Sequence, residues 1–241
     1  FIFLKNRVIV YITKQMEVFM KKIVFVVLAL IVVVGMVQAS DMRFGFKSGL
    51  VLGNVSDDME FFVAPEIVLE KKMKPGLALG GMVHMPLMEG NLVLMGELGY
   101  LQKGACFETK DSGYTFDGYL KADYIQLDLL AKYMFHERIG IFAGPGLGYL
   151  LSAEMAQFVW EEIPDPEMNG EYSEFALKID AKDEMKSMDF SLNIGAQFSA
   201  TDNLIVDIRY NLGLTNIVDV DDEGAPEFKN SAIILGVGYL F

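Results

Sequence analysis

Apolar and polar side chains alternate along two neighbouring segments near the C-terminal end of the chain. In residues 189–199 apolar side chains fall on one face and polar side chains or glycine on the other, and residues 204–214 repeat the pattern. A period of two is typical of a β-strand with one apolar face. Thr201, Asp202 and Asn203 supply a tight polar turn between the two segments. The pattern therefore predicts an antiparallel hairpin.

The same alternation recurs upstream and at the C-terminus, and it predicts six further strands, at residues 43–53, 76–86, 91–108, 119–135, 139–153 and 230–241. The connections alternate in length: the long ones are 54–74, 109–118, 154–186 and 218–229, and the short ones are 87–90, 136–138 and 200–203. Within the first long connection, residues 61–70 are apolar enough to extend the neighbouring strands or to form a short helix. Alternating long and short connections are typical of outer-membrane barrels, whose short turns lie in the periplasm.

The first forty residues differ in composition from the rest of the chain. Met20, Lys21 and Lys22 form a positive segment, residues 23–36 are apolar, and Val37-Gln38-Ala39 reads as a small-residue cleavage site. We expect residues 1–39 to be an upstream segment plus a secretory signal peptide, and residues 40–241 to be the mature domain. The residues before Met16 or Met20 are interpreted as a gene-model error, with an unusually long positive region as the alternative.

These features predict an all-β fold, an eight-stranded antiparallel up-and-down transmembrane β-barrel in the outer membrane with both termini in the periplasm. After residue 39 no apolar run is long enough for a transmembrane helix. A half-buried sheet of a water-soluble protein would show the same alternation. The signal peptide, the repeated hairpins and the aromatic last residue favour the membrane barrel.

The predicted strands contain two sets of side chains, and the members of each set lie at a common depth. One set points outward near the periplasmic end and forms an expected aromatic girdle: Phe44, Phe46, Tyr133, Phe135, Phe198, Tyr239 and Phe241. The other set points inward, roughly three to eight residues from the periplasmic end of each strand, and forms an expected lumen charge belt: Lys47, Glu97, Asp128, Lys132, Asp207 and Arg209. Three belt residues are basic and three acidic, so we expect mutual neutralisation and a closed lumen, since eight strands leave room only for side chains.

The charge and the cysteine content of the chain exclude some classes of function and one kind of cross-link. Removing residues 1–39 takes away five of the 20 basic residues and one of the 33 acidic residues, which leaves 15 basic, 32 acidic and a net charge of −17. Such a chain is not expected to bind nucleic acid. Cys106 is the single cysteine, so an internal disulfide is excluded.

Several stretches resemble the PorT-type outer-membrane β-barrel domain family: FGFKSGLVLGN (44–54), GELGYLQKGACFE (96–108), LKADYIQLDLLAKYMF (120–135), AGPGLGYLLSAE (143–154), IRYNLGLTNI (208–217) and GVGYLF (236–241). Asp128 stands where that family usually has proline, so this inward position departs from the family pattern. The resemblance covers nearly the whole mature chain and implies a small closed barrel in the outer membrane. It implies no single activity, because a few members are linked to protein secretion and most are known by fold.

Two candidate chemistries are weak. Asp219, Asp221 and Glu223 match the first half of a calcium loop, but Asn230 stands in place of its bidentate glutamate, so a solvated acidic loop is the favoured interpretation. A lipid-modifying enzyme would need a histidine beside a nucleophile, and His84 and His136 are the two histidines. We therefore expect neither a cofactor nor enzymatic activity.

Two hypotheses about function remain. The favoured one is a non-enzymatic envelope protein with a closed lumen and acidic external loops, in a structural, partner-binding or secretion-accessory role. The alternative is a small pore or transport component. The expected partners are outer-membrane lipid, the barrel-assembly machinery and an envelope or secretion protein, and we expect a monomer.

Overall fold

The computed structural model describes residues 42–56, 69–87, 91–111, 114–161, 173–218 and 227–241. The described residues form nine strands and one short 3-10 helix: β1 (Arg43–Val55), β2 (Leu69–Leu87), β3 (Leu92–Asp111), β4 (Tyr114–His136), β5 (Ile139–Glu161), β6 (Ser173–Asp180), η2 (Lys182–Glu184), β7 (Met188–Ser199), β8 (Leu204–Gly213) and β9 (Asn230–Leu240). The expected signal peptide lies outside these residues, and so do residues 61–68 of the first long connection.

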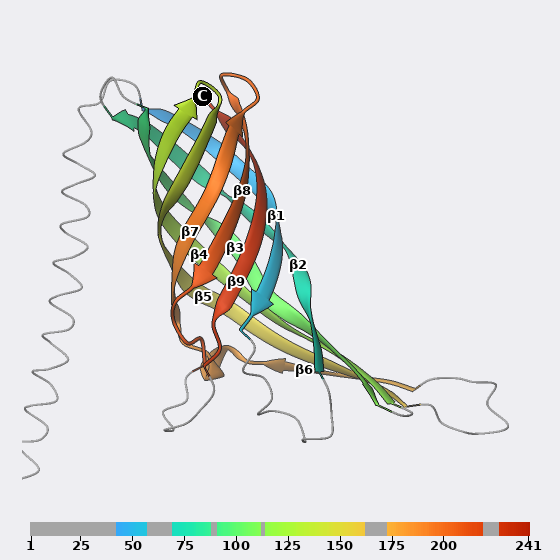
Figure 1. The fold of residues 1–241 in the computed structure, drawn as a ribbon. Coiled ribbons are helices and arrows are strands. Elements are labelled where there is room, and N and C mark those ends of the chain that lie inside the picture. Colours follow the sequence, from blue (N-terminus) through green and yellow to red (C-terminus); the bar gives the residue numbers. More distant parts are fainter. Residues whose placement is uncertain (1–41, 57–68, 88–90, 112–113, 162–172, 219–226) are drawn as a thin grey trace, which may run out of the picture. The chain divides into compact units, whose positions relative to one another are not determined.

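Eight of the strands close into an antiparallel ring (Figure 1). β1 pairs with β2 on one side and with β9 on the other, and β4 pairs with β5, so the order around the ring is β1-β2-β3-β4-β5-β7-β8-β9. β6 lies outside this ring and pairs with the far end of β5. The predicted eight-stranded antiparallel barrel is therefore confirmed.

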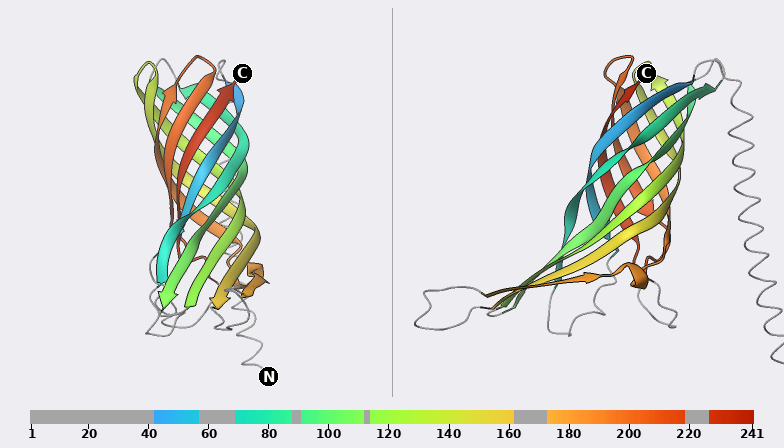
Figure 2. Two further views of the ribbon diagram at one scale, coloured as in Figure 1. Left: turned by 90° about the vertical axis from the view of Figure 1, so that its right-hand side faces the viewer. Right: turned by 180° about the vertical axis from the view of Figure 1, so that it is seen from behind.

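The prediction of the long connections was partly wrong. Residues 154–161 and 173–180 are strands that pair with each other. β3 continues to Asp111 and β4 begins at Tyr114, both within the segment predicted as a loop. β2 begins at Leu69, so residues 69–74 of the first long connection extend a strand. These extensions leave the ring as a protruding sheet, which Figure 2 shows in its right-hand view. In β6 the apolar residues Phe175, Leu177 and Ile179 alternate with Glu174, Lys178 and Asp180. The sequence therefore carried a strand signal here, which the acidic composition of residues 154–186 outweighed in the prediction.

The two ends of the barrel differ. We call the short-turn rim the end that carries the turns after β2, β4 and β7 together with Phe241, and the long-loop rim the opposite end. At the short-turn rim the Arg43 guanidinium donates to the backbone oxygens of Asp202 (2.5 Å) and Leu240 (3.3 Å), and so joins the start of β1 to the end of β9. This contact lies at the seam where the first and last strands complete the ring.

Side chains alternate between the interior and the outer wall along each ring strand. In β8 the side chains of Ile205, Asp207, Arg209 and Asn211 are buried, and the apolar side chains between them are exposed. The interior thus holds most of the buried charges, and the exposed surface of the ring is apolar. Within the described residues, no helix is both long enough and apolar enough to cross a membrane.

Candidate functional site in the barrel interior

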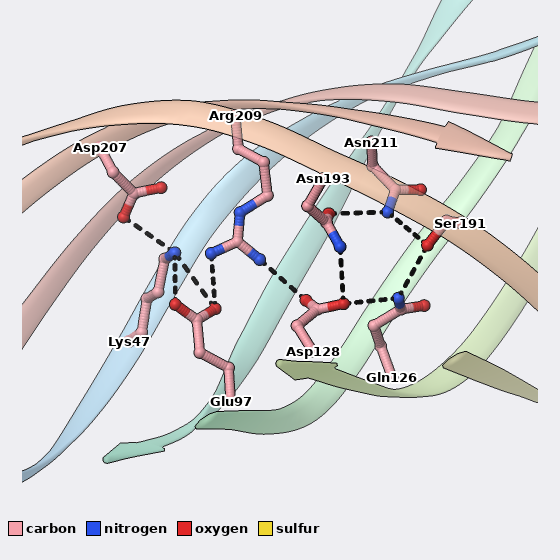
Figure 3. A network of polar contacts seen from close by, with 9 residues as sticks. All are labelled: Lys47, Glu97, Gln126, Asp128, Ser191, Asn193, Asp207, Arg209 and Asn211. Atoms are coloured by element: carbon pink, nitrogen blue, oxygen red, sulfur yellow. Dashed lines mark hydrogen bonds and ion pairs between the residues drawn. The ribbon is translucent and has the colours of Figure 1, made fainter. Parts of the chain in front are cut away.

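Five charged side chains from four strands meet across the interior of the barrel (Figure 3). Arg209 of β8 donates from Nη1 to Asp128 Oδ2 (2.8 Å) and from Nη2 to Glu97 Oε2 (2.7 Å). Lys47 of β1 places its Nζ 2.8 Å from Asp207 Oδ2 and 3.4 Å from Glu97 Oε2. The ion pairs therefore run in one continuous chain from Asp207 to Asp128, and we call these five residues the belt.

The strand register explains why an arginine stands at the centre of the belt. Glu97 and Asp128 are directly opposite each other on β3 and β4. Like charges at such a position repel. The planar guanidinium of Arg209 presents separate donors to the two carboxylates and neutralises both, which a lysine ammonium would do less well. Arg209 also stacks over the Phe142 ring, 5.1 Å from its centroid.

Neutral polar side chains continue the belt toward the long-loop rim. Asp128 Oδ1 accepts hydrogen bonds from Asn193 Nδ2 (2.9 Å) and Gln126 Nε2 (2.8 Å). Asn211 Nδ2 donates to Asn193 Oδ1 (2.8 Å) and to Ser191 Oγ (2.9 Å). All these side chains are buried. Figure 3 shows them crossing the interior beside the belt, so the polar contacts extend from β1 to β7 and β8.

Glycines make the space that these side chains occupy. A Cβ added to Gly146 on β5 would lie 2.4 Å from Asp128 Oδ1 and 2.4 Å from Gln126 Nε2. A Cβ added to Gly236 on β9 would lie 2.6 Å from the Lys47 Cε. The interior is therefore filled up to the backbone of the wall at both positions. Glycine within a strand often marks a site that another group approaches closely.

The remaining member of the predicted charge belt is set apart. Lys132 is buried on β4, and its Nζ donates to Gln197 Oε1 of β7 rather than to a carboxylate. The five joined residues carry three carboxylates and two cations. Lys132 lies two inward positions along β4 from Asp128, with the buried Leu130 between them. The structure thus places all six predicted residues inside the barrel and joins five of them directly.

Sequence reasoning missed a second buried ion pair closer to the long-loop rim. Lys103 Nζ of β3 lies 3.0 Å from Asp189 Oδ2 of β7, and both side chains are fully buried. Both residues occupy inward positions of their strands, so the alternation places them in the interior. What the alternation does not reveal is the depth at which two distant strands bring such residues together.

The predicted girdle residues all lie on the outer wall near the short-turn rim. Seven aromatic side chains are exposed there: Phe44, Phe46, Tyr133, Phe135, Phe198, Tyr239 and Phe241. The Phe241 ring contacts the rings of Phe46 and Tyr239, with centroids 5.9 and 5.5 Å apart. Aromatic rings at this level are typical of the membrane interface.

The weaker candidates do not form a site in the part of the chain that the structure describes. Asp219, Asp221 and Glu223 lie outside the described residues, and no cluster of metal-ligating side chains occurs within them. His84 is buried in β2 at the short-turn rim, and His136 accepts a hydrogen bond from the Arg138 backbone in an exposed turn. The two histidines therefore lie in different surroundings at this rim.

Comparison with known proteins finds one matching family. The model of the family described as outer membrane protein beta-barrel domain matches residues 37–219. The match does not test the finer PorT-type assignment, which stays a prediction. A search of curated proteins finds no match.

Among solved structures, the chain is similar to Ail, the attachment invasion locus protein of Yersinia pestis, with 14% identity, 83% of this chain and 99% of that chain covered, and a TM-score of 0.43. It is also similar to Neisserial surface protein A, with 11% identity, coverage of 84% and 100%, and a TM-score of 0.38. OprG from Pseudomonas aeruginosa has 9% identity, coverage of 83% and 94%, and a TM-score of 0.31.

Proposed function

Because the chain belongs to the outer membrane protein beta-barrel domain family, we propose that it is a non-enzymatic envelope protein whose lumen is closed and whose long-loop rim meets its partners outside the cell. The outer wall of the barrel contacts outer-membrane lipid. The barrel-assembly machinery inserts the protein into the outer membrane as a monomer. The observation that carries the proposal is the belt of Lys47, Glu97, Asp128, Asp207 and Arg209.

The belt supports closure because its side chains span the interior from β1 to β4 and β8. A cavity of about 50 Å³ lies beside it, lined in part by Glu97, Gly99 and Arg209. Since a water molecule needs roughly 10–15 Å³ of such space, this cavity has room for only a few waters. Ion pairs with fixed partners on both sides favour a plug over a hydrated channel.

Orientation follows from the connections. Short turns of outer-membrane barrels face the periplasm and long loops face outward. On this basis the short-turn rim and both termini are periplasmic, and the protruding sheet of β3, β4, β5 and β6 is external. Protease added to intact cells should then cut between Glu161 and Glu174 and spare the turns at 136–138 and 201–203. Cleavage confined to those turns would invert the topology.

The external segments favour a partner that is not a polyanion. The segment from Glu154 to Lys186 carries ten acidic and three basic residues, and the mature chain has an excess of negative charge. Such a surface repels nucleic acid and attracts cationic groups. A structural or secretion-accessory role for these external segments is compatible with this charge. Recovery of a specific envelope protein with the detergent-solubilised barrel, lost when residues 162–172 are replaced by a glycine-serine linker, would identify the partner.

The alternative is a small pore, and conductance separates the two. In planar lipid bilayers the closed barrel should show no steady conductance above the lipid background. Folding of the barrel must be verified by the different migration of unheated and boiled samples on a denaturing gel, because a closed barrel resists unfolding. A steady channel from verified, unmutated barrel would favour the pore.

A further inference from the structure

Four segments at the long-loop rim are tied into one layer, which we call the collar: residues 54–56, 181–187, 215–218 and 227–230. The Ser56 backbone donates to Lys229 O (2.9 Å), Ile217 donates to Phe228 O (2.7 Å), and Lys186 donates to Ile217 O (2.8 Å). Asn216 Oδ1 accepts hydrogen bonds from the backbones of Val218 and Phe228, both at 3.1 Å. The bases of three connections are thus fixed to one another.

The collar places apolar side chains over the opening of the barrel. Met185, Ile217 and Phe228 are buried. They belong to one apolar cluster with the inward-facing side chains of Leu120, Tyr124 and Leu150 on β4 and β5, together with Val55, Ala105, Ala122, Ala153 and Ala181. Side chains from the collar therefore pack on the inner surface of the wall rather than on its outside. The collar covers the mouth.

A buried ion pair lies directly beneath this apolar layer. Asp189 accepts hydrogen bonds from Lys103 Nζ (3.0 Å) and Asn230 Nδ2 (3.0 Å) on Oδ2, and from Thr215 Oγ1 (3.1 Å) on Oδ1. The Lys103 ammonium also lies over the Tyr124 ring, 5.3 Å from its centroid. We call these five residues the latch.

Three of the five latch residues lie at or next to points where the collar joins the strands. Asp189 follows residues 181–187, Thr215 follows β8, and Asn230 begins β9. Lys103 comes from β3 on the other side of the ring. A buried carboxylate that loses its cation is costly, so the pair favours the arrangement in which the collar segments stay together over the mouth.

From this arrangement we infer that the collar and latch form a second seal of the lumen, separate from the belt. The inference rests on the closed lumen proposed above and deepens it: the belt shuts the interior near the short-turn rim, and the collar shuts it at the long-loop rim. The two seals share no residue, and the neutral side chains of Gln126, Ser191 and Asn211 lie between them. Ions must pass both in series.

Two seals in series make a specific prediction for conductance. One variant, Glu97→Ala with Arg209→Ala, removes one charge of each sign from the belt. A matched variant, Lys103→Ala with Asp189→Ala, removes one charge of each sign from the latch. Each variant alone should show no steady conductance in planar bilayers, because the other seal remains. The variant that combines all four substitutions should conduct steadily.

The outcomes distinguish this inference from the proposed function. A conducting wild type contradicts the closed lumen itself. If the wild type does not conduct but either paired variant alone conducts steadily, the inference of two seals is wrong, because a single seal then closes the lumen. Silence of the fourfold variant, with correct folding verified by gel migration, overturns them as well.

A second measurement covers the case in which the fourfold variant fails to fold. In a Cys106→Ser background, Ser191→Cys places a thiol between the two seals. In detergent micelles this thiol should resist a small water-soluble thiol reagent when both seals are intact. Lys103→Ala with Asp189→Ala should abolish that protection, whereas Lys178→Ala, an exposed control outside the collar, should leave it unchanged. Unaltered protection after loss of the latch pair would contradict the inference.

Discussion

The interior and the outer wall of this barrel are built from adjacent residues with opposite requirements. Arg209 is 3% exposed and binds two carboxylates, and its neighbour Ile208 is 52% exposed on the wall. In a water-soluble protein the usual preference is the reverse, with the isoleucine inside and the arginine outside. Successive residues of a strand point to opposite sides, so Ile208 faces the outer wall and Arg209 faces the interior. This arrangement depends on lipid outside the barrel and on paired charges inside it.

The outer wall and the interior are stabilised in different ways. On the wall an apolar side chain is stabilised by lipid and needs no particular partner. In the interior each charge depends on a named partner at a fixed distance, because unpaired buried charges are costly. A substitution that keeps the size of a side chain but removes its polar partner should therefore lower stability in the interior. On the outer wall, a substitution by another apolar side chain of similar size should be tolerated.

The largest effect is expected from Arg209→Ala. The substitution leaves Glu97 and Asp128 facing each other with only Lys47 near one of them. Loss of one partner from a buried pair typically costs about 3–5 kcal/mol. The free energy of unfolding in urea, measured in lipid vesicles, should fall by this amount. Arg138→Ala, in an exposed turn, is the matched control and should change it by less than about 0.5 kcal/mol.

The next effect comes from placing a charge on the wall beside the belt. Ile208→Arg puts a guanidinium into lipid on the same strand and at the same depth as Arg209. The expected cost is about 2–4 kcal/mol when the position lies at the bilayer midplane. The same unfolding measurement applies, with Ile208→Leu as the apolar control. An unchanged stability for Ile208→Arg would mean that this face of β8 does not contact lipid.

A smaller effect is expected from filling the interior. Gly146→Ala places a methyl group against Asp128 and Gln126, both 2.4 Å away before relaxation. Such overpacking typically costs about 1–3 kcal/mol. Gly81→Ala is the outward control, because its nearest neighbour would lie 3.9 Å from the added Cβ. Equal stability of the two variants would show that the interior has spare room at Gly146.

The smallest effect on stability is expected for an exposed ion pair on the protruding sheet. Lys178 Nζ lies 3.8 Å from Glu154 Oε1 on the protruding sheet, and both side chains are largely exposed. Exposed pairs contribute about 0.2–1 kcal/mol and are screened by salt. Lys178→Ala should therefore change the unfolding free energy by no more than this at low salt, and by less at high salt.

Much of the ring could be predicted from sequence because lipid imposes a strict alternation. β8 and the start of β1 have one apolar and one polar face, so strand positions and inward residues such as Lys47 and Asp207 follow directly. The protruding sheet was missed although part of its signal was present. In β6 the apolar residues Phe175, Leu177 and Ile179 alternate with charged residues, but the segment is short and lies within an acidic stretch, and its pairing with the outer part of β5 is visible only in the structure.

The partners inside the barrel were harder to predict than its members. The sequence placed Lys132 in the charge belt with the other five residues, but its ammonium reaches Gln197 of β7 instead. Likewise Lys103 and Asp189 are separated by 86 positions in the chain, and only the three-dimensional ring brings them to one level. Contacts across a barrel depend on shear and tilt as well as on alternation, and local sequence does not encode these.

Scanning β8 with a spin label tests the central claim most directly. In a Cys106→Ser background, single cysteines at 205–212 carry the label in lipid vesicles, and collision rates with oxygen and with a water-soluble relaxing agent are measured at each position. We expect a period of two: positions 206, 208, 210 and 212 collide with oxygen, and positions 205, 207, 209 and 211 collide with neither. Collision of position 211, which is not a belt residue, with the water-soluble agent would contradict a closed interior, and loss of the period would contradict the inward and outward assignment itself.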